Sequence, residues 1–108
     1  MAFTDCLWGG RLTTVKLDPV RHECTLRIDV LRDGVDSTHE LLCRGVTELR
    51  FFNEIPAPWS HAEVTEVAAD VDSIEGGWRL EVMLWSEQAE LTLRCVEVSL
   101  DGEPQTHP

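Results

Sequence analysis

Residues 44–61, RGVTELRFFNEIPAPWSH, decide the fold because they place a glycine and two prolines around a short apolar run. Gly45 has no side chain to pack, and it predicts a bulge or bend inside a system of strands. We expect the chain to turn a corner there and to continue as a strand through the two phenylalanines. The prolines cannot donate hydrogen bonds to a strand ladder, so the segment before Trp59 is expected to be an extended connector.

Trp59 follows this connector and is the most prominent aromatic residue of the stretch. A large indole next to an extended connector is typical of a plug that covers one end of a hydrophobic core. The alternative interpretation is a platform on which a ligand stacks.

Alternation of apolar and charged residues predicts antiparallel strands on both sides of this stretch. In residues 24–32, Leu26, Ile28 and Val30 share one face, whereas charged residues occupy the other, which is typical of a half-buried strand. By the same reasoning, strands are expected at residues 12–17, 24–32, 39–44, 46–52, 78–85 and 91–100.

Residues 60–74 fit two patterns. Ser60 and Glu63 have the spacing of a helix capping box, whereas the apolar residues that follow also fit a strand. Gly76 and Gly77 mark a hairpin turn, and a strand before them would pair with residues 78–85. We therefore favour a short helical turn near residues 58–61 and then a strand to about Ser73.

The pattern as a whole predicts a mainly β protein: an antiparallel sandwich or strongly curved sheet of about seven short strands, with at most one short helix. The apolar phase changes within residues 91–100, which indicates a bulge there. We expect one domain over residues 1–100 and a polar tail over residues 101–108.

The acidic residues are concentrated in the second half of the chain. Residues 1–50 carry 7 Lys/Arg and 8 Asp/Glu, whereas residues 51–108 carry 2 and 12, so that the halves contribute −1 and −10 to the net charge of −11. This charge disfavours binding to nucleic acid phosphates and suits a basic protein partner. Solvated strand faces are the simpler explanation for most of these carboxylates.

The start of the chain has no basic segment followed by an apolar one, and no apolar run approaches the length of a membrane span. We therefore expect a cytoplasmic protein that does not bind membranes. The four cysteines, Cys6, Cys24, Cys43 and Cys95, are widely spaced, which predicts reduced and mostly buried thiols rather than a zinc site or disulfide framework.

No motif for catalysis or for a cofactor is recognisable. His61 with Glu63 could offer two metal ligands, and His39 precedes Glu40, but neither pair has a further partner at a metal-binding spacing. The sequence therefore predicts no catalytic, cofactor or metal residues and favours a protein that is not an enzyme. Tryptophans next to turns, and carboxylates close together, are the candidates for an interface with a partner. These candidates are Trp78, Trp8, Glu63, Glu66, Asp70 and Asp72.

The runs CTLRIDV, ELLCRGVTELRFFN, EGGWRLEV and AELTLRCVEVSL together resemble small bacterial β-rich proteins of the YxiG-like or immunity-protein-like families. Residues 41–51 approximate the Leu-x-Phe-x-Gly-Val-x-x-Leu-x-Phe pattern of these families, with Cys43 at a position where an aromatic residue is usual. The resemblance covers most of residues 8–100. It implies an intracellular inhibitor, and it carries over no catalytic residue.

Three hypotheses of function follow. The first is a non-enzymatic protein-interaction domain, in its most specific form an immunity-type inhibitor that binds a basic partner through its acidic C-terminal half. The second is a small-molecule-binding protein or enzyme with a pocket between the sheets, which predicts a concave site lined by a tryptophan and a few polar groups. The third is a homodimer that forms by pairing of sheet edges.

Overall fold

The computed structural model describes residues 3–72 and 76–106 of the chain. It contains one 3-10 helix, η1 (Phe3–Leu7), and nine strands. The strands are β1 (Arg11–Asp18), β2 (Glu23–Arg32), β3 (Val35–Arg44), β4 (Glu48–Asn53), β5 (Ala62–Val71), β6 (Trp78–Leu84), β7 (Ala89–Cys95), β8 (Glu97–Leu100) and β9 (Glu103–Pro104).

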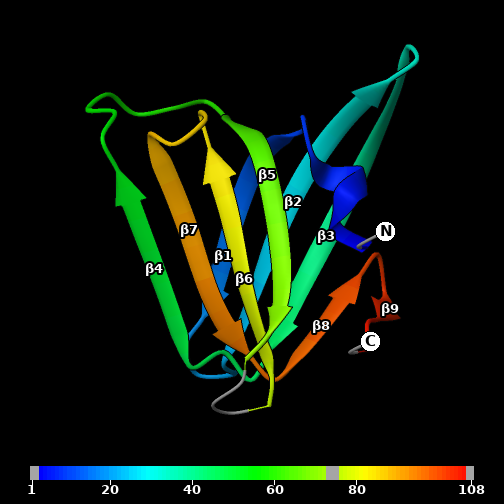
Figure 1. The fold of residues 1–108 in the computed structure, drawn as a ribbon, viewed down its shortest axis with the longest axis vertical. Coiled ribbons are helices and arrows are strands. Elements are labelled where there is room, and N and C mark those ends of the chain that lie inside the picture. The colour runs from blue at the N-terminus through cyan, green and yellow to red at the C-terminus, as the bar shows by residue number, and fades with distance from the viewer. Residues whose placement is uncertain (1–2, 73–75, 107–108) are drawn as a thin grey trace.

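All nine strands belong to one antiparallel sheet in the order β4-β7-β6-β5-β1-β2-β3-β8-β9. The sheet is strongly curved, so that its two halves face each other, and it does not close, because β4 and β9 remain as its ends (Figure 1). The predicted fold class, mainly β with antiparallel strands and at most one short helix, is confirmed. The predicted number of strands, about seven, is too low.

The two halves of the sheet are joined where β1 meets β5, and this junction is short. Only two residue pairs link these strands, Arg11 with Glu63 and Leu12 with Ala62. By contrast, β1 pairs with β2 along its whole length, and β5 pairs with β6 along most of its own. Most of β1 therefore has no neighbouring strand on the side that faces β5.

The two halves meet again at a crossing of two chain segments. The backbone N–H of Thr47, between β3 and β4, donates to the carbonyl of Arg94 at 2.9 Å, and the N–H of Val96, between β7 and β8, donates to that of Arg44 at 2.9 Å. Each segment leaves one half of the sheet and enters the other. Gly45 has a φ of +68°, and the corner predicted at this glycine is confirmed.

The same crossing explains why the single strand predicted at residues 91–100 is two strands, β7 and β8, in the structure. Residues 91–100 were predicted as one strand with a bulge, but the chain bends at Val96 and divides them between β7 in one half and β8 in the other. The change of apolar phase therefore marks a switch between the halves of the sheet. The second additional strand, β9, lies within the predicted tail and pairs with the end of β8.

The strand predicted after residue 60 is confirmed, whereas the helical turn before it is wrong. Ala62–Val71 form β5, with an irregularity between Val64 and Glu66, and residues 58–61 form no helical turn and include a bend at Ser60. The rings of Trp59 and Phe51 pack edge to face with centroids 5.9 Å apart, and this contact holds the connector against the sheet. The predicted end of the strand, near Ser73, lies outside the described residues.

Apolar side chains from both halves of the sheet form one continuous core. The inward residues alternate along each strand, as in Leu80, Val82 and Leu84 of β6, which are at most 1% exposed. Helix η1 covers part of this core with Leu7, which is fully buried. Burial of this kind is the main source of the fold's stability, at roughly 25 cal/mol per Å² of apolar surface.

Candidate ligand-binding cleft

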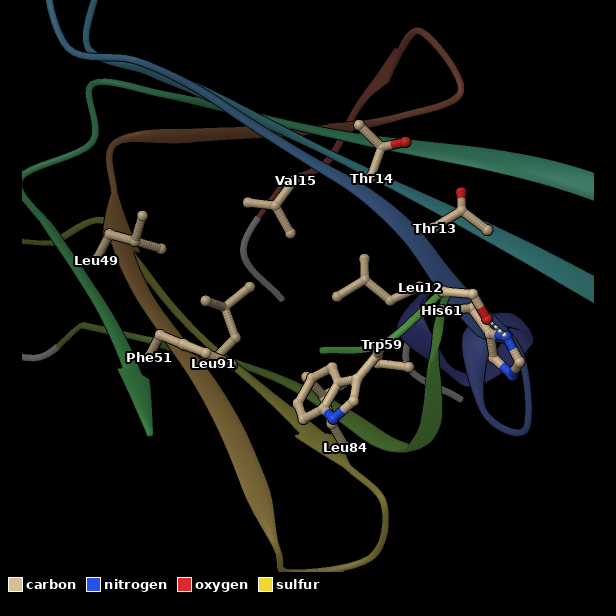
Figure 2. A pocket seen from close by; sticks show the side chains of 12 residues that line it. Leu12, Thr13, Thr14, Val15, Leu49, Phe51, Trp59, His61, Leu84 and Leu91 are labelled. Atoms are coloured by element: carbon tan, nitrogen blue, oxygen red, sulfur yellow. Dashed lines mark hydrogen bonds between the residues drawn. The ribbon is translucent and has the colours of Figure 1, made fainter. Parts of the chain in front are cut away.

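A cleft opens between β1 and β4, on the side where the sheet does not close (Figure 2). Beyond Leu12, β1 has no pairing with β5, and β4 pairs with β7 on its other side. The volume of the cleft is about 390 Å³, which lies within the range of small-molecule sites. Its apolar wall includes Leu12, Val15, Leu49, Phe51, Trp59 and Leu91.

The register of the strands shows why this wall is unusual. Val15 of β1 lies opposite Leu26, which is fully buried, so both side chains point to the inner face of the sheet. Val15 is nevertheless 43% exposed. Phe51 of β4 lies opposite Leu91, which is 4% exposed, yet Phe51 itself is 58% exposed. These residues face the core side of the sheet, and no strand of the described chain covers them.

The neighbouring Phe52 is also exposed, at 52%, but it points to the outer face of the sheet because residues alternate along a strand. The two adjacent phenylalanines therefore lie on opposite faces of the sheet. Phe51 lines the cleft, and Phe52 does not.

Trp59 anchors an aromatic cluster at one end of the cleft. Its ring packs edge to face against Phe51 and against Trp85, with centroids 5.9 Å and 6.1 Å apart, and His61 lies 5.8 Å from Trp85. The indole N–H groups of Trp59 and Trp85 are buried, and no hydrogen-bond acceptor reaches them in the described chain. The sequence predicted Trp59 as a plug, and its position at the wall of the cleft also fits the alternative of a ligand platform.

The polar side chains that line the cleft are few. Hydroxyl groups come from Thr13, Thr14 and Ser60, and Ser60 Oγ lies 3.3 Å from Nδ1 of His61. Among the described residues, no lysine, arginine, aspartate or glutamate lines the cleft. A charged group buried there would lose hydration without gaining a counter-ion, so the site favours an uncharged, mainly apolar molecule.

Two of the interface candidates from the sequence are buried. Trp78 is 4% exposed and packs edge to face with Phe3, at a centroid distance of 5.6 Å. Asp72 is 7% exposed, with its Oδ2 3.9 Å from Nε of Arg94. Neither side chain offers a surface to a partner in this conformation. The alternation that buries Leu80 would have indicated this for Trp78, which has the same phase on β6.

The other candidates lie on accessible parts of the fold but do not form one cluster with the cleft. Trp8 is 43% exposed, and its Nε1 donates a hydrogen bond of 3.0 Å to the Val67 carbonyl. Glu63 and Asp70 are exposed on β5, and Glu66 is half-buried there. Of the ion pairs found in the described residues, none involves these three carboxylates.

The cysteines occupy positions that fit their predicted state. All four are free thiols, and Cys24, Cys43 and Cys95 are at most 4% exposed. A hydrogen bond with Cys95, together with burial, raises the pKa of the Cys43 thiol. The prediction that most of the cysteines are buried is confirmed.

Two further properties concern only the residues that the structure describes. Within residues 3–72 and 76–106, no three side chains of His, Cys, Asp or Glu are grouped so that they could hold a metal ion. In the same part of the chain, no helix is long and apolar enough to cross a membrane.

Comparison with known proteins gives no family for this chain. No family model matches it, and a search of the curated proteins returned no match.

Proposed function

We propose that the protein binds a small, uncharged and mainly apolar molecule in the cleft between β1 and β4. The observation that supports this proposal is the exposure of inward-facing apolar residues, above all Phe51 at 58% and Val15 at 43%. Apolar side chains that face the inside of a sheet are normally covered. A ligand that covered them would gain roughly 25 cal/mol for each Å² of apolar surface removed from water.

The charge of the protein narrows the class of ligand. A net charge of −11 repels anions at long range, and the described residues that line the cleft include no lysine or arginine to pair with a carboxylate or phosphate. A neutral aromatic or aliphatic molecule fits both conditions. Its polar group would meet the hydroxyls of Thr13, Thr14 or Ser60, or the ring of His61.

Binding of the neutral fluorescent probe N-phenyl-1-naphthylamine tests this proposal. We expect saturable binding to the wild-type protein, with quenching of tryptophan emission because Trp59 lines the cleft. Phe51→Ala removes an aromatic wall and is expected to weaken binding about tenfold, which corresponds to about 1.4 kcal/mol.

Phe52→Ala is the matched control, because this residue is the neighbour of Phe51 on the same strand and is similarly exposed on the opposite face. We expect it to leave the affinity of the probe within about twofold. Equal weakening by both substitutions, or no saturable binding to the wild-type protein, would refute the proposal.

A second candidate function is that of an immunity-type inhibitor that binds a basic protein, as the resemblance to immunity-type proteins implies. Three carboxylates on β5, those of Glu63, Glu66 and Asp70, have no ion-pair partner within the described residues, and this supports the candidate. Charge complementarity of this kind speeds association and weakens as salt rises.

Capture of partners from a cell lysate at low and moderate salt tests this second candidate. A basic protein retained at low salt by the wild-type chain, and lost from a variant in which all three carboxylates become amides, would support it. Retention that is equal for both chains and insensitive to salt would contradict it.

A further inference from the structure

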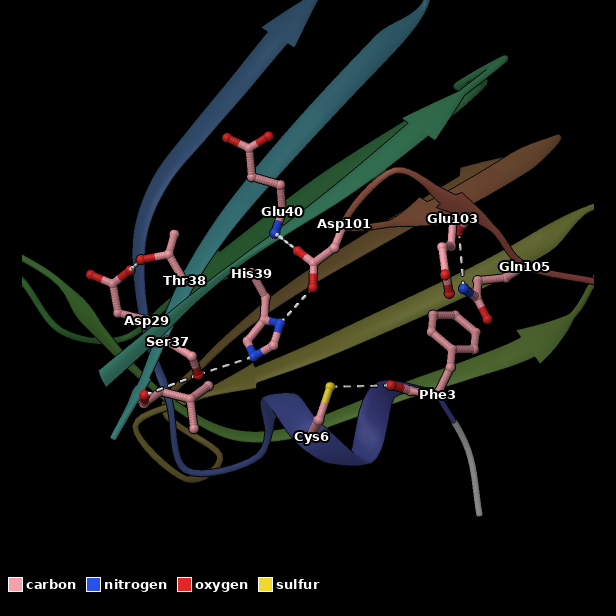
Figure 3. A network of polar contacts seen from close by, with 11 residues as sticks. Phe3, Cys6, Asp29, Ser37, Thr38, His39, Glu40, Asp101, Glu103 and Gln105 are labelled. Carbon is pink, nitrogen blue, oxygen red and sulfur yellow. Dashed lines mark hydrogen bonds and ion pairs between the residues drawn. The ribbon is translucent and has the colours of Figure 1, made fainter. Parts of the chain in front are cut away.

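A second cluster of polar side chains lies on β3 and at the turn after β8, toward the β9 end of the sheet (Figure 3). Nε2 of His39 lies 3.3 Å from Oγ of Ser37, and Nδ1 of the same ring lies 2.7 Å from Oδ2 of Asp101. A hydroxyl, an imidazole and a carboxylate are thus connected in series through the two different nitrogens of one ring. Such an arrangement is recognised by its geometry and not by the order of its residues in the chain.

The strand β3 places the first two groups together. Ser37 and His39 are two residues apart, so their side chains point to the same face of the strand. Ser37 is exposed and His39 is half-buried. The hydroxyl of Ser37 also reaches the carbonyl of Val30 at 3.4 Å, so it has two acceptors and donates to one of them at a time.

The turn between β8 and β9 brings the third group to the same place. Oδ1 of Asp101 accepts a hydrogen bond of 2.8 Å from the backbone N–H of Glu40, and the N–H of Asp101 donates to the Glu40 carbonyl at 2.9 Å. These two bonds fix the orientation of the carboxylate next to His39. Asp101 has a φ of +52°, a backbone conformation that few residues other than glycine adopt.

The carboxylate also determines which ring nitrogen carries the proton. Partial burial raises the pKa of Asp101, but hydrogen bonds from His39 and from the Glu40 N–H, with the charge of His39, outweigh it and hold this pKa below its usual range. An ionised carboxylate 2.7 Å from Nδ1 favours a proton on Nδ1. The lone pair of Nε2 is then directed at Ser37 Oγ, where it can accept the proton of the hydroxyl.

We propose that Ser37 is a reactive nucleophile, with His39 as its general base and Asp101 as the residue that positions His39, toward small acyl esters and organophosphorus electrophiles. With an ester, Ser37 Oγ bonds to the carbonyl carbon and its proton passes to Nε2 of His39. That proton then leaves with the alcohol as the ester bond breaks. Water, deprotonated by His39, cleaves the acyl-serine, releases the carboxylic acid and restores the hydroxyl.

This inference does not rest on the proposed function of the cleft, because the two sites share no residue. The class of substrate follows from the exposure of Ser37, which lets a small electrophile approach its Oγ from solvent.

Labelling with a fluorophosphonate probe, followed by intact-protein and peptide mass spectrometry, tests the proposal. In this reaction the Ser37 Oγ–P bond forms, the P–F bond breaks, fluoride leaves and the proton passes to His39. Ser60 provides an internal comparison, because its Oγ also lies 3.3 Å from a histidine nitrogen, Nδ1 of His61. Among the hydrogen bonds and ion pairs found in the described residues, however, His61 has no carboxylate partner, whereas His39 has Asp101. We expect the label on Ser37 to exceed that on Ser60 at least about tenfold.

Variants assign the roles of the three residues. Ser37→Ala should abolish the label, and His39→Gln should slow labelling by about a hundredfold, which is the lower end of the effect of a general base. Asp101→Asn should slow it at least about tenfold, whereas Asp101→Glu, which keeps the carboxylate, should retain more of the rate. Urea denaturation of each variant shows that it is folded under the labelling conditions.

Thr38→Ala serves as the control, because the Thr38 hydroxyl bonds to the carboxylate of Asp29 at 2.9 Å and faces away from His39. It should label at the rate of the wild-type protein. The absence of label on Ser37 in the wild-type protein would overturn the proposal. So would a labelling rate that the folded His39→Gln variant leaves unchanged.

Discussion

Gly45 and Val96 meet at the point where the two chain segments cross between the halves of the sheet. A Cβ atom on Gly45 would lie 2.8 Å from Cγ2 and 2.9 Å from Cβ of Val96, which is closer than such atoms approach in folded proteins. The φ of Gly45 is also +68°, in the left-handed region. Both the backbone conformation and the space at this crossing therefore require glycine.

Substitution of this glycine tests the importance of the crossing for the fold. Gly45→Ala should lower the free energy of unfolding by about 2–4 kcal/mol, because it combines an unfavourable φ with overpacking against Val96. Gly34→Ala is the matched control, since Gly34 has a φ of +74° but nothing within 4 Å of its added Cβ. We expect the control to cost about 1 kcal/mol in urea denaturation. Equal costs for the two variants would show that the contact with Val96 is unimportant.

Much of the fold could be predicted from local patterns, because alternation and turn residues act over short distances. Gly45 indicated the corner, and the alternation in residues 24–32 indicated a half-buried strand. In the sequence, the switch at Val96 resembles a bulge, since a change of apolar phase looks the same whether a strand bulges or joins another part of the sheet. Only the pairing of distant strands distinguishes the two.

The candidate sites were less predictable, because they depend on what is missing around a side chain or on contacts between distant residues. Val15 and Phe51 look like core residues in the sequence, and only the short junction between β1 and β5 leaves them exposed. The spacing of Ser37 and His39 can be seen on one strand, but Asp101 is 62 residues from His39 along the chain.

Asp101 should make stability depend on pH in the acid range. The pKa of Asp101 is lowered in the folded protein. Its contribution to stability is therefore complete above the ordinary carboxyl pKa of about 3.9, and it is lost as the pH falls through the pKa of the folded state. At neutral pH, Asp101→Asn should lower the free energy of unfolding by about 1 kcal/mol. The effect is modest because solvent screens the charge of a side chain that is 44% exposed.

The difference in unfolding free energy between wild type and Asp101→Asn, measured by urea denaturation at several pH values, checks this. The difference should shrink at low pH. Asp36→Asn is the control, because Asp36 is 74% exposed and its Oδ1 lies 3.9 Å from a guanidinium nitrogen of Arg11. This substitution should lower the free energy of unfolding by less than about 0.5 kcal/mol at every pH. A difference for Asp101→Asn that is constant down to the most acidic conditions would contradict the assigned interactions.

All four thiols should be protected from reaction in the native protein. Cys24, Cys43 and Cys95 are buried, whereas Cys6 is half-buried, and burial followed by the nearby charge of Asp101 raises the pKa of Cys6. Because the thiolate is the reactive form, even Cys6 should react slowly with Ellman's reagent in the native protein. All four thiols should react at once after unfolding in urea. Rapid reaction of two or more thiols in the native protein would contradict the described core.

Filling the cleft should prevent binding without unfolding the protein. Val15→Trp places a large side chain on the inner face of β1, where Val15 is 43% exposed. It is expected to abolish binding of N-phenyl-1-naphthylamine while leaving the free energy of unfolding within about 1 kcal/mol. Lys16→Trp, one residue further along β1 and on the outer face, is the control and should bind the probe normally.

The most direct test of the proposed function is a titration of the ¹⁵N-labelled protein with N-phenyl-1-naphthylamine, followed by two-dimensional ¹H–¹⁵N NMR. The proposal predicts saturable shifts at Thr13–Val15, Leu49–Phe51 and Trp59–Ala62, which surround the cleft. The backbone of β8 and β9, at the far end of the sheet, should remain unshifted. Shifts scattered over the outer face, or none at saturating probe, would contradict binding in the cleft between β1 and β4.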